Sequence, residues 1–451
     1  MLGIGRTVSP SGIRPAPARP LAIVVVTVVA LIAAIYTGSL ISRLTSEKNG
    51  ILFLFVMIDA VLSFIYYRFA LLQFVFLALI GEPFPEQGSA LQLVGVVVAA
   101  RRAFDLALGK PLRGSSNMTT LAAAIYIAAQ SLSLLGSSDV SATLRGLLTS
   151  VQLFVLLILV IDFCSTRGQL AAVVTVTMLA GLFNAVLAIY QSDGAGATRA
   201  AGIVGNANEL GFSQVTLLAL MLPFIGRAAS PRRILLLTTC LAAVMYSVAL
   251  SLSRGAMIAA AGVLLYYVLF CRGRKLVASL AIVVVIAGIL ILMPERVYDR
   301  IGEIPLPGLS HSAPLDSSAE IRRLYIDIGI RMGFDHPWTG VGLKQFDANI
   351  TRYGNLWLVP ANSAHNMYVS VFAETGLPGL VTFAMLLSVA FRTARRRAIA
   401  DPYSPAGAVA RGSELGILAV ALAGFFGSFE YVKIPWILFA LANVPSEPNA
   451  Q

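Results

Sequence analysis

Charged residues are scarce in this chain: Asp, Glu, Lys and Arg make up 12% of its 451 residues, whereas 57% are hydrophobic. A water-soluble protein of this length could not keep so apolar a sequence off its surface, so we expect the lipid bilayer to be its solvent. The ten-residue alternation typical of membrane barrels is also missing. Because backbone polar groups need internal partners in hydrocarbon, the long apolar runs predict membrane-spanning helices.

Cysteines and cofactor motifs are scarce as well. Cys164, Cys240 and Cys271 lie in or beside apolar runs without CxxC spacing, which supports neither a disulfide framework nor a zinc site. The sequence has no nucleotide-binding loop, no HExxH helix and no external DxD pair, so it implies no ATP, metal or other cofactor. A substrate would therefore have to arrive already activated.

The basic excess of the chain, a formal net charge of +11, falls in short clusters between the apolar runs. Such clusters are typical of loops on the cytoplasmic side of a membrane and argue against nucleic acid as a partner. Four loops are expected there, each named by its basic residues: Arg101, Arg102, Lys110 and Arg113; Arg227, Arg232 and Arg233; Arg272, Arg274 and Lys275; and Arg392, Arg395, Arg396 and Arg397. The number of crossings between them is even, which predicts that both termini are cytoplasmic.

The apolar runs predict an all-α, polytopic inner-membrane protein with about 12, and at most 14, transmembrane helices. The candidate spans are residues 21–40, 51–65, 70–80, 90–100, 119–135, 147–161, 170–190, 209–225, 234–252, 256–270, 276–293, 367–391, 415–426 and 432–441. Runs 70–80 and 90–100 are short for a span. The predicted divisions are a cytoplasmic tail (1–20), a helix bundle (21–293), a periplasmic loop domain (294–364), C-terminal spanning helices (365–445) and a second tail (446–451).

The loop domain is much longer than an ordinary connection, which favours a functional role. Ser317 or Ser318 can cap an amphipathic helix that continues through Ile328 and would lie on the membrane surface. Pro337 and the Gly340-Val341-Gly342 segment should then end this helix in a turn. Alternation of the spans places three further connections on the same external side, at residues 191–208, 253–255 and 430–431.

His365 lies where the external loop becomes a helix. Its imidazole could accept a proton from a sugar hydroxyl, and the alternative is a structural polar residue at the helix start. Arg254, at the outer end of two apolar helices, offers a planar donor fork for phosphate or serves as an interfacial anchor. Arg199 is a second candidate anion ligand or a solvated loop residue, and the nearby Asn208 could cap the next helix.

Four other polar residues lie near these segments. Arg322 and Arg323 could add to an anion site, although a solvated helix face is the favoured role for at least one of them. His336, beside Pro337, is interpreted as part of a turn. Glu374, about two turns into an apolar helix, needs a partner or a function, and the sequence does not decide between them.

The ordered motifs of this chain resemble the O-antigen ligase and polymerase superfamily. They are Arg199 to Asn208, Ser253-Arg254-Gly255, His336-Pro337 with Gly340-Val341-Gly342, and Ala364-His365-Asn366 with Glu374 and Gly376-Leu377-Pro378-Gly379. The resemblance covers roughly the C-terminal 60% of the chain. It implies glycan transfer from undecaprenyl diphosphate to an acceptor hydroxyl on the periplasmic face, without nucleotide or metal.

The resemblance also implies residue roles. His365 would be the catalytic base, Arg199, Arg254 and Arg322 would bind the diphosphate, and Asn208, Asn366, Glu374 and His336 would support them. The acceptor would be lipid A core, as in a ligase, or a growing polysaccharide, as in an O-antigen or exopolysaccharide polymerase. An alternative of another class is a transporter of a solute or a lipid-linked glycan, which predicts discontinuous helices at mid-membrane.

Overall fold

The computed structural model describes residues 50–80, 90–114, 116–194, 199–203, 205–225, 227, 230–270, 317–354 and 363–444, together with residues 279, 282, 283 and 286. The predicted span 21–40, most of the predicted span 276–293 and both predicted tails lie outside the described residues. Every other predicted span corresponds to a helix, and no β-strand occurs in the described part of the chain.

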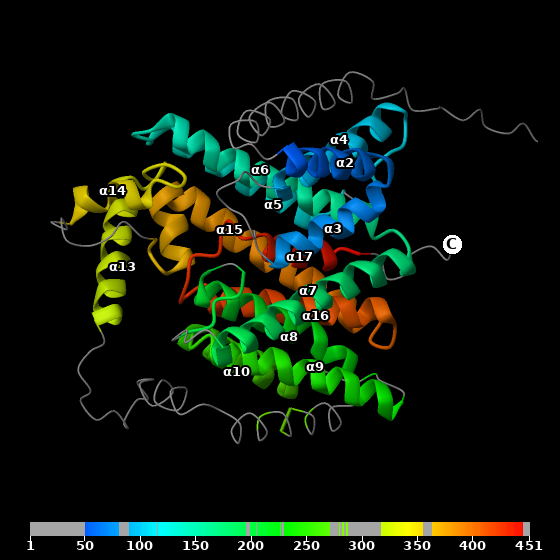
Figure 1. Cartoon of the computed structure of the whole chain (residues 1–451). Coiled ribbons are helices and arrows are strands. Elements are labelled where there is room, and N and C mark those ends of the chain that lie inside the picture. Colours follow the sequence, from blue (N-terminus) through cyan, green and yellow to red (C-terminus); the bar gives the residue numbers. More distant parts are fainter. Residues whose placement is uncertain are drawn as a thin grey trace, which may run out of the picture.

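The helices run across Figure 1, most of them side by side and α13 (Ser317–Asp335) at an angle to the others. They are α2 (Gly50–Ile65), α3 (Tyr67–Ile80), α4 (Ala90–Ala107), α5 (Met118–Ser131), the 3₁₀ helix η2 (Leu132–Leu135), α6 (Val140–Phe163), α7 (Arg167–Gly194), α8 (Ala207–Ile225), α9 (Pro231–Leu250), α10 (Arg254–Phe270), α13 (Ser317–Asp335), α14 (Phe346–Tyr353), α15 (Met367–Ala400), α16 (Pro405–Ala423) and α17 (Lys433–Leu441). Among the described residues, seven helices are long and apolar enough to cross a membrane. The chain is thus an all-helical, multi-pass membrane protein, and the total of 12 to 14 spans stays a prediction.

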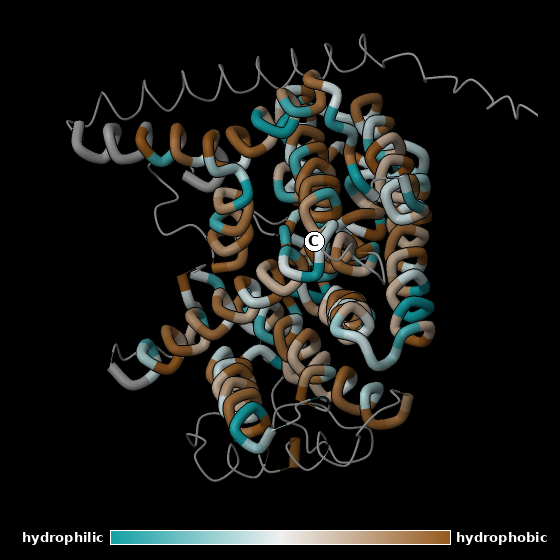
Figure 2. Tube along the Cα trace, turned by 90° about the vertical axis from the view of Figure 1, so that its right-hand side faces the viewer, coloured by the Kyte–Doolittle hydropathy of each residue, from teal (hydrophilic) through white to brown (hydrophobic). Residues whose placement is uncertain are grey.

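The small residues of α16 allow close helix packing at the centre of the bundle, where α8 and α16 are the most buried of these helices. A Cβ atom on Gly412 would approach the Leu220 Cα atom to 3.0 Å, so the two backbones nearly touch. Helices in lipid associate largely through such close packing, because burial of apolar surface adds little there. Figure 2 shows that hydrophobic residues follow the helices of the bundle along much of their length.

Two helices extend further than their apolar runs predict, so basic residues that we expected in loops lie in helical turns. α4 continues to Ala107 because Arg101 pairs with Asp105 at 3.0 Å within the helix. Arg102 donates from Nε and Nη2 to the Asp162 carboxylate of α6, at 2.6 and 3.0 Å. α15 likewise continues to Ala400 through its basic cluster. Burial of these charges costs desolvation energy, which the two-bond pairing of Arg102 with Asp162 offsets.

α13 and α14 lie at one end of the bundle, and α13 runs across the direction of the spanning helices (Figure 1). Tyr325, Ile328 and Met332 of α13 are buried against Phe346 and Ala373, which makes a second hydrophobic core outside the main bundle. The predicted helix and its end before Pro337 are therefore confirmed. Its contact with the membrane surface stays a prediction.

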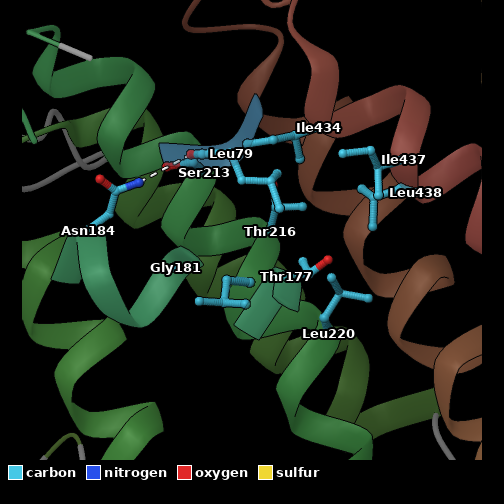
Figure 3. A pocket seen from close by; sticks show the side chains of 11 residues that line it. Leu79, Thr177, Gly181, Asn184, Ser213, Thr216, Leu220, Ile434, Ile437 and Leu438 are labelled. Carbon is cyan, nitrogen blue, oxygen red and sulfur yellow. Dashed lines mark hydrogen bonds between the residues drawn. The ribbon is translucent and has the colours of Figure 1, made fainter. Parts of the chain in front are cut away.

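A small cavity inside the bundle has a volume of about 20 Å³, room for about one water molecule and too little for a sugar. Asn184 of α7 lines it and donates from Nδ2 to the Leu79 carbonyl of α3 at 3.2 Å, as the dashed line in Figure 3 shows. This bond connects two helices where they would cross the membrane. The cavity has a structural role, and the substrate site must be sought elsewhere.

Candidate functional site

Arg199 is held by groups from two other segments at the end of the bundle that carries α13. Its Nε donates to the Ser251 carbonyl and its Nη2 to Asn208 Oδ1, both at 3.0 Å. The backbone N–H of Ala200 adds a bond to the Leu250 carbonyl at 3.1 Å. The guanidinium plane is therefore fixed between the start of α8 and the end of α9.

The prediction that Asn208 caps α8 is wrong, because Asn206 is the capping residue. Asn206 Oδ1 accepts from the N–H groups of Asn208 at 2.9 Å and Glu209 at 3.4 Å. Gly205 has a positive φ of 72°, which turns the chain into the helix before Asn206. Asn208 thus lies in the first turn, where its side chain can hold Arg199.

Arg254 is the first residue of α10 and is half-buried. The chain turns just before it, where Leu252 adopts a positive φ of 51°. Behind it, a Cβ atom on Gly255 would lie 2.3 Å from Phe426 Cβ, so this turn packs against the segment that follows α16. Arg254 is fixed in position by that close approach.

His365 precedes α15 and also has a positive φ of 51°. The next residue, Asn366, caps the helix by accepting from the N–H groups of Tyr368 at 3.0 Å and Val369 at 3.1 Å. The N–H of Met367 donates to the Gly424 carbonyl at 2.7 Å, which fastens this segment to the end of α16. A non-glycine residue in the left-handed region stores strain that its surroundings must hold, and such strain is common at functional sites.

The His365 imidazole is half-buried, with its ring centroid 6.3 Å from that of Tyr325 in α13. Burial lowers the pKa of His365, and the positive charge of Arg322 lowers this pKa further. Both effects favour the neutral imidazole, the form that can accept a proton. Arg322 is half-buried on α13, whereas its neighbour Arg323 is exposed, as expected for a solvated position.

The residues singled out in the sequence therefore lie on a continuous set of packed segments at one end of the bundle. Arg199 bonds the end of α9, the α10 start packs on Phe426, and Asn366 Nδ2 donates to the Phe425 carbonyl at 3.5 Å. His365 is the residue before Asn366, and Arg322 lies close enough for its charge to lower the pKa of His365. Segments about 160 residues apart in sequence are thus linked by packing and hydrogen bonds at this end of the bundle.

The turn that begins at His336 docks on α15 beside Glu374, where Gly376 breaks the helix. The Val341 and Gly342 N–H groups donate to the carbonyls of Ala373 and Glu374 at 2.9 and 3.1 Å. The Leu377 N–H donates to the Pro337 carbonyl at 2.7 Å. The backbone of His336 forms hydrogen bonds with Met332 and Gly340, in accord with the turn role that the sequence favours.

Gly340 and Gly376 are the positions where this docking requires glycine. Gly340 has a φ of 63°, and a Cβ on it would lie 2.2 Å from the Glu374 carbonyl carbon. Gly376 has a φ of 65°, and its Cβ would lie 2.5 Å from the Pro337 oxygen. The two backbones are in direct contact, which sets the position of α13 and hence of Arg322.

Gly340→Ala should lower the stability of the folded protein by roughly 1–3 kcal/mol, because the added methyl group meets backbone atoms at a positive φ. The thermal unfolding midpoint of the purified protein in detergent measures this change. Gly168→Ala in the first turn of α7 is the matched control, since a Cβ there meets nothing within 4 Å. An equal midpoint for both variants would contradict the docking role of the turn.

A buried polar cluster that sequence reasoning missed surrounds the Glu374 carboxylate. Tyr431 donates its hydroxyl to Glu374 Oε2 at 2.7 Å, and the Lys344 ammonium lies 5.1 Å from the Tyr431 ring centroid. Burial, with the nearby charge of Glu374, raises the pKa of Glu430 to about 8. The position of residues 430–431 in an external connection was the only sequence signal for this cluster.

A cavity of about 340 Å³ adjoins this cluster. Its walls are apolar residues of α4 and α6, among them Val96, Leu148 and Leu156, and its polar lining includes Lys344 and Lys433. Lys433 is close enough to Glu209, beside Asn208, for their charges to interact. An apolar cavity with ammonium groups at one end is suited to a lipid chain that carries a phosphate.

Among the described residues, no group of three or more His, Cys, Asp or Glu side chains is placed to hold a metal ion. Comparison with known families shows that residues 238–384 match the O-antigen ligase family. The matched range includes Arg254, Arg322, His365 and Glu374 and leaves out Arg199. A search of curated proteins gave no match.

Proposed function

Because residues 238–384 belong to the O-antigen ligase family, we propose that this membrane protein transfers a glycan from undecaprenyl diphosphate to an acceptor hydroxyl. The observation that carries the proposal is the half-buried His365, favoured in its neutral form and fastened beside Arg322 at the same end of the bundle as Arg199 and Arg254. A neutral imidazole can accept the acceptor's proton, and guanidinium groups suit a diphosphate.

The proposed reaction is an inverting displacement. His365 takes the proton of the acceptor hydroxyl while the hydroxyl oxygen forms a bond to the anomeric carbon of the donor sugar. The bond from that carbon to the diphosphate oxygen breaks, and the arginines stabilise the charge that grows on the leaving lipid diphosphate. No nucleotide or metal is needed in this mechanism, because the diphosphate is already a good leaving group.

The neighbouring cavity supports a lipid-borne substrate. A chain lying along α6 would keep its phosphate near Lys344 and Lys433, at the same end of the bundle as His365. Arg102 and Arg395 lie near the other ends of α4 and α15, and Arg227 lies just after α8. The positive-inside rule assigns this side of the bundle to the cytoplasm. On this basis the active site faces the periplasm from the inner membrane.

Reconstituted transfer tests the proposal. Purified protein in liposomes receives an undecaprenyl-diphosphate glycan and either lipid A core or a second lipid-linked glycan as acceptor. We expect free undecaprenyl diphosphate and one enlarged acceptor, and the acceptor that is enlarged decides between ligase and polymerase. A donor that crosses the membrane chemically unchanged would favour the transporter alternative and contradict the proposal.

Arg322→Gln should shift the acid limb of the pH profile of transfer to higher pH. The positive charge of Arg322 lowers the pKa of His365, so its removal raises that pKa, and the base is then protonated at a higher pH. The measurement is the rate against pH, scaled to the maximum of each variant. Arg323→Gln is the control. If the acid limbs of the two variants fell at the same pH, the coupling of Arg322 to His365 would be contradicted.

A further inference from the structure

A third cavity, of about 470 Å³, lies between α7, α8, α9 and α16. Its lining includes Arg167, Arg227 and Arg233, together with apolar residues such as Leu170, Val174 and Leu237. It therefore combines basic groups with apolar walls, and the proposed transfer reaction uses none of its residues.

The helices that form this cavity place it away from the candidate active site. α9 begins at Pro231 near the cavity and ends at Leu250, just before the Ser251 carbonyl that holds Arg199. Its 20 residues correspond to about 30 Å, the thickness of the bilayer's hydrocarbon core. α16 runs in the same direction, from Pro405 beside the cavity to Ala423, next to the Gly424 carbonyl that accepts from Met367.

The charges around the cavity are arranged for an anion. α7, α9 and α16 all begin at its edge, at Arg167, Pro231 and Pro405, so the positive ends of three helix dipoles face it. Arg227 donates to the Ser404 carbonyl and lies near Asp401, which together fix its position. None of the described carboxylates forms an ion pair with Arg167 or Arg233.

We propose that this cavity binds an anionic phospholipid from the membrane leaflet opposite the active site. One acyl chain lies against Val174 and Leu237, and the phosphodiester lies between Arg167 and Arg233. Exposed Tyr403 at the rim suits the headgroup region, where aromatic side chains are enriched. Basic pockets between spanning helices recognise anionic headgroups by this combination of charge and apolar surface. The inference holds independently of the reaction that the protein catalyses.

The test is native mass spectrometry of the full chain titrated with phosphatidylglycerol or phosphatidylcholine. The double variant Arg167→Gln/Arg233→Gln should bind phosphatidylglycerol about 30-fold more weakly, since each basic residue contributes roughly 1 kcal/mol and about 1.4 kcal/mol corresponds to tenfold. The double variant Arg113→Gln/Arg232→Gln removes two exposed charges near the same end without touching the cavity, and it should bind like the parent.

Two further measurements distinguish a lipid site from a simple charge effect. Ala171→Trp fills the cavity without changing charge and should also weaken phosphatidylglycerol binding. Equal losses in the two double variants, or full binding by Ala171→Trp, would overturn the proposal. Displacement of phosphatidylglycerol by excess inorganic phosphate would overturn it too, because the site would then recognise phosphate alone.

Discussion

His365→Ala should reduce glycan transfer by about 10²- to 10⁴-fold, the range that a general base contributes. The substitution removes the imidazole that the structure places beside Arg322 and Tyr325. Asn366 still caps α15, so the helix start and the bond from Met367 to Gly424 should persist. The measurement is the initial rate in liposomes at equal protein abundance.

His336→Ala is the matched control for this loss. Its hydrogen bonds to Met332 and Gly340 use backbone atoms, which the substitution keeps, so we expect transfer and abundance close to those of the parent. Donor binding by His365→Ala should also remain, since the proposed diphosphate contacts come from arginines. Full transfer activity in His365→Ala would remove the base assignment, whereas loss of donor binding would show that the residue is structural.

Arg254→Lys should reduce transfer by about 10²- to 10³-fold although the charge is kept. A guanidinium offers several donors in a fixed plane and can hold two phosphate oxygens at once, whereas an ammonium is a point charge on a flexible chain. The backbone at this position is held by the close packing of Gly255 on Phe426, so the shorter reach of lysine cannot be recovered by a shift of the helix.

Arg323→Lys serves as the comparison for Arg254→Lys, because Arg323 is exposed on α13 beside the half-buried Arg322. It should change the rate by less than about twofold, since exposed charges contribute little. Transfer by Arg254→Lys at the rate of Arg323→Lys would mean that charge alone suffices, and the forked contact to the diphosphate would have to be abandoned.

The helices were predictable because apolar runs of spanning length leave the backbone no other structure in lipid. The extension of α4 could not be predicted in this way. Arg102 is neutralised by Asp162, which lies 60 residues away in sequence and meets it only in the folded chain. The capping error has a local cause: Asn206 and Asn208 are both good caps, and the positive φ of Gly205 decides between them.

The candidate site could likewise be predicted from the sequence only in part. Glycines, prolines and a histidine at a helix start are visible in the sequence, so His365 and the turn before α14 could be located. The cluster of Glu374 and Tyr431 with Lys344 depends on side chains from three segments meeting in a buried space, and no spacing in the sequence encodes that meeting. The roles assigned to His365 and the arginines remain predictions.

The most direct measurement is a cryo-electron microscopy structure of the purified protein with undecaprenyl diphosphate bound. The proposed function predicts diphosphate density that contacts the guanidinium groups of Arg199 and Arg254, with His365 within reach of the adjoining sugar position. Diphosphate density confined to the opposite end of the bundle, between Arg167 and Arg233, would contradict it.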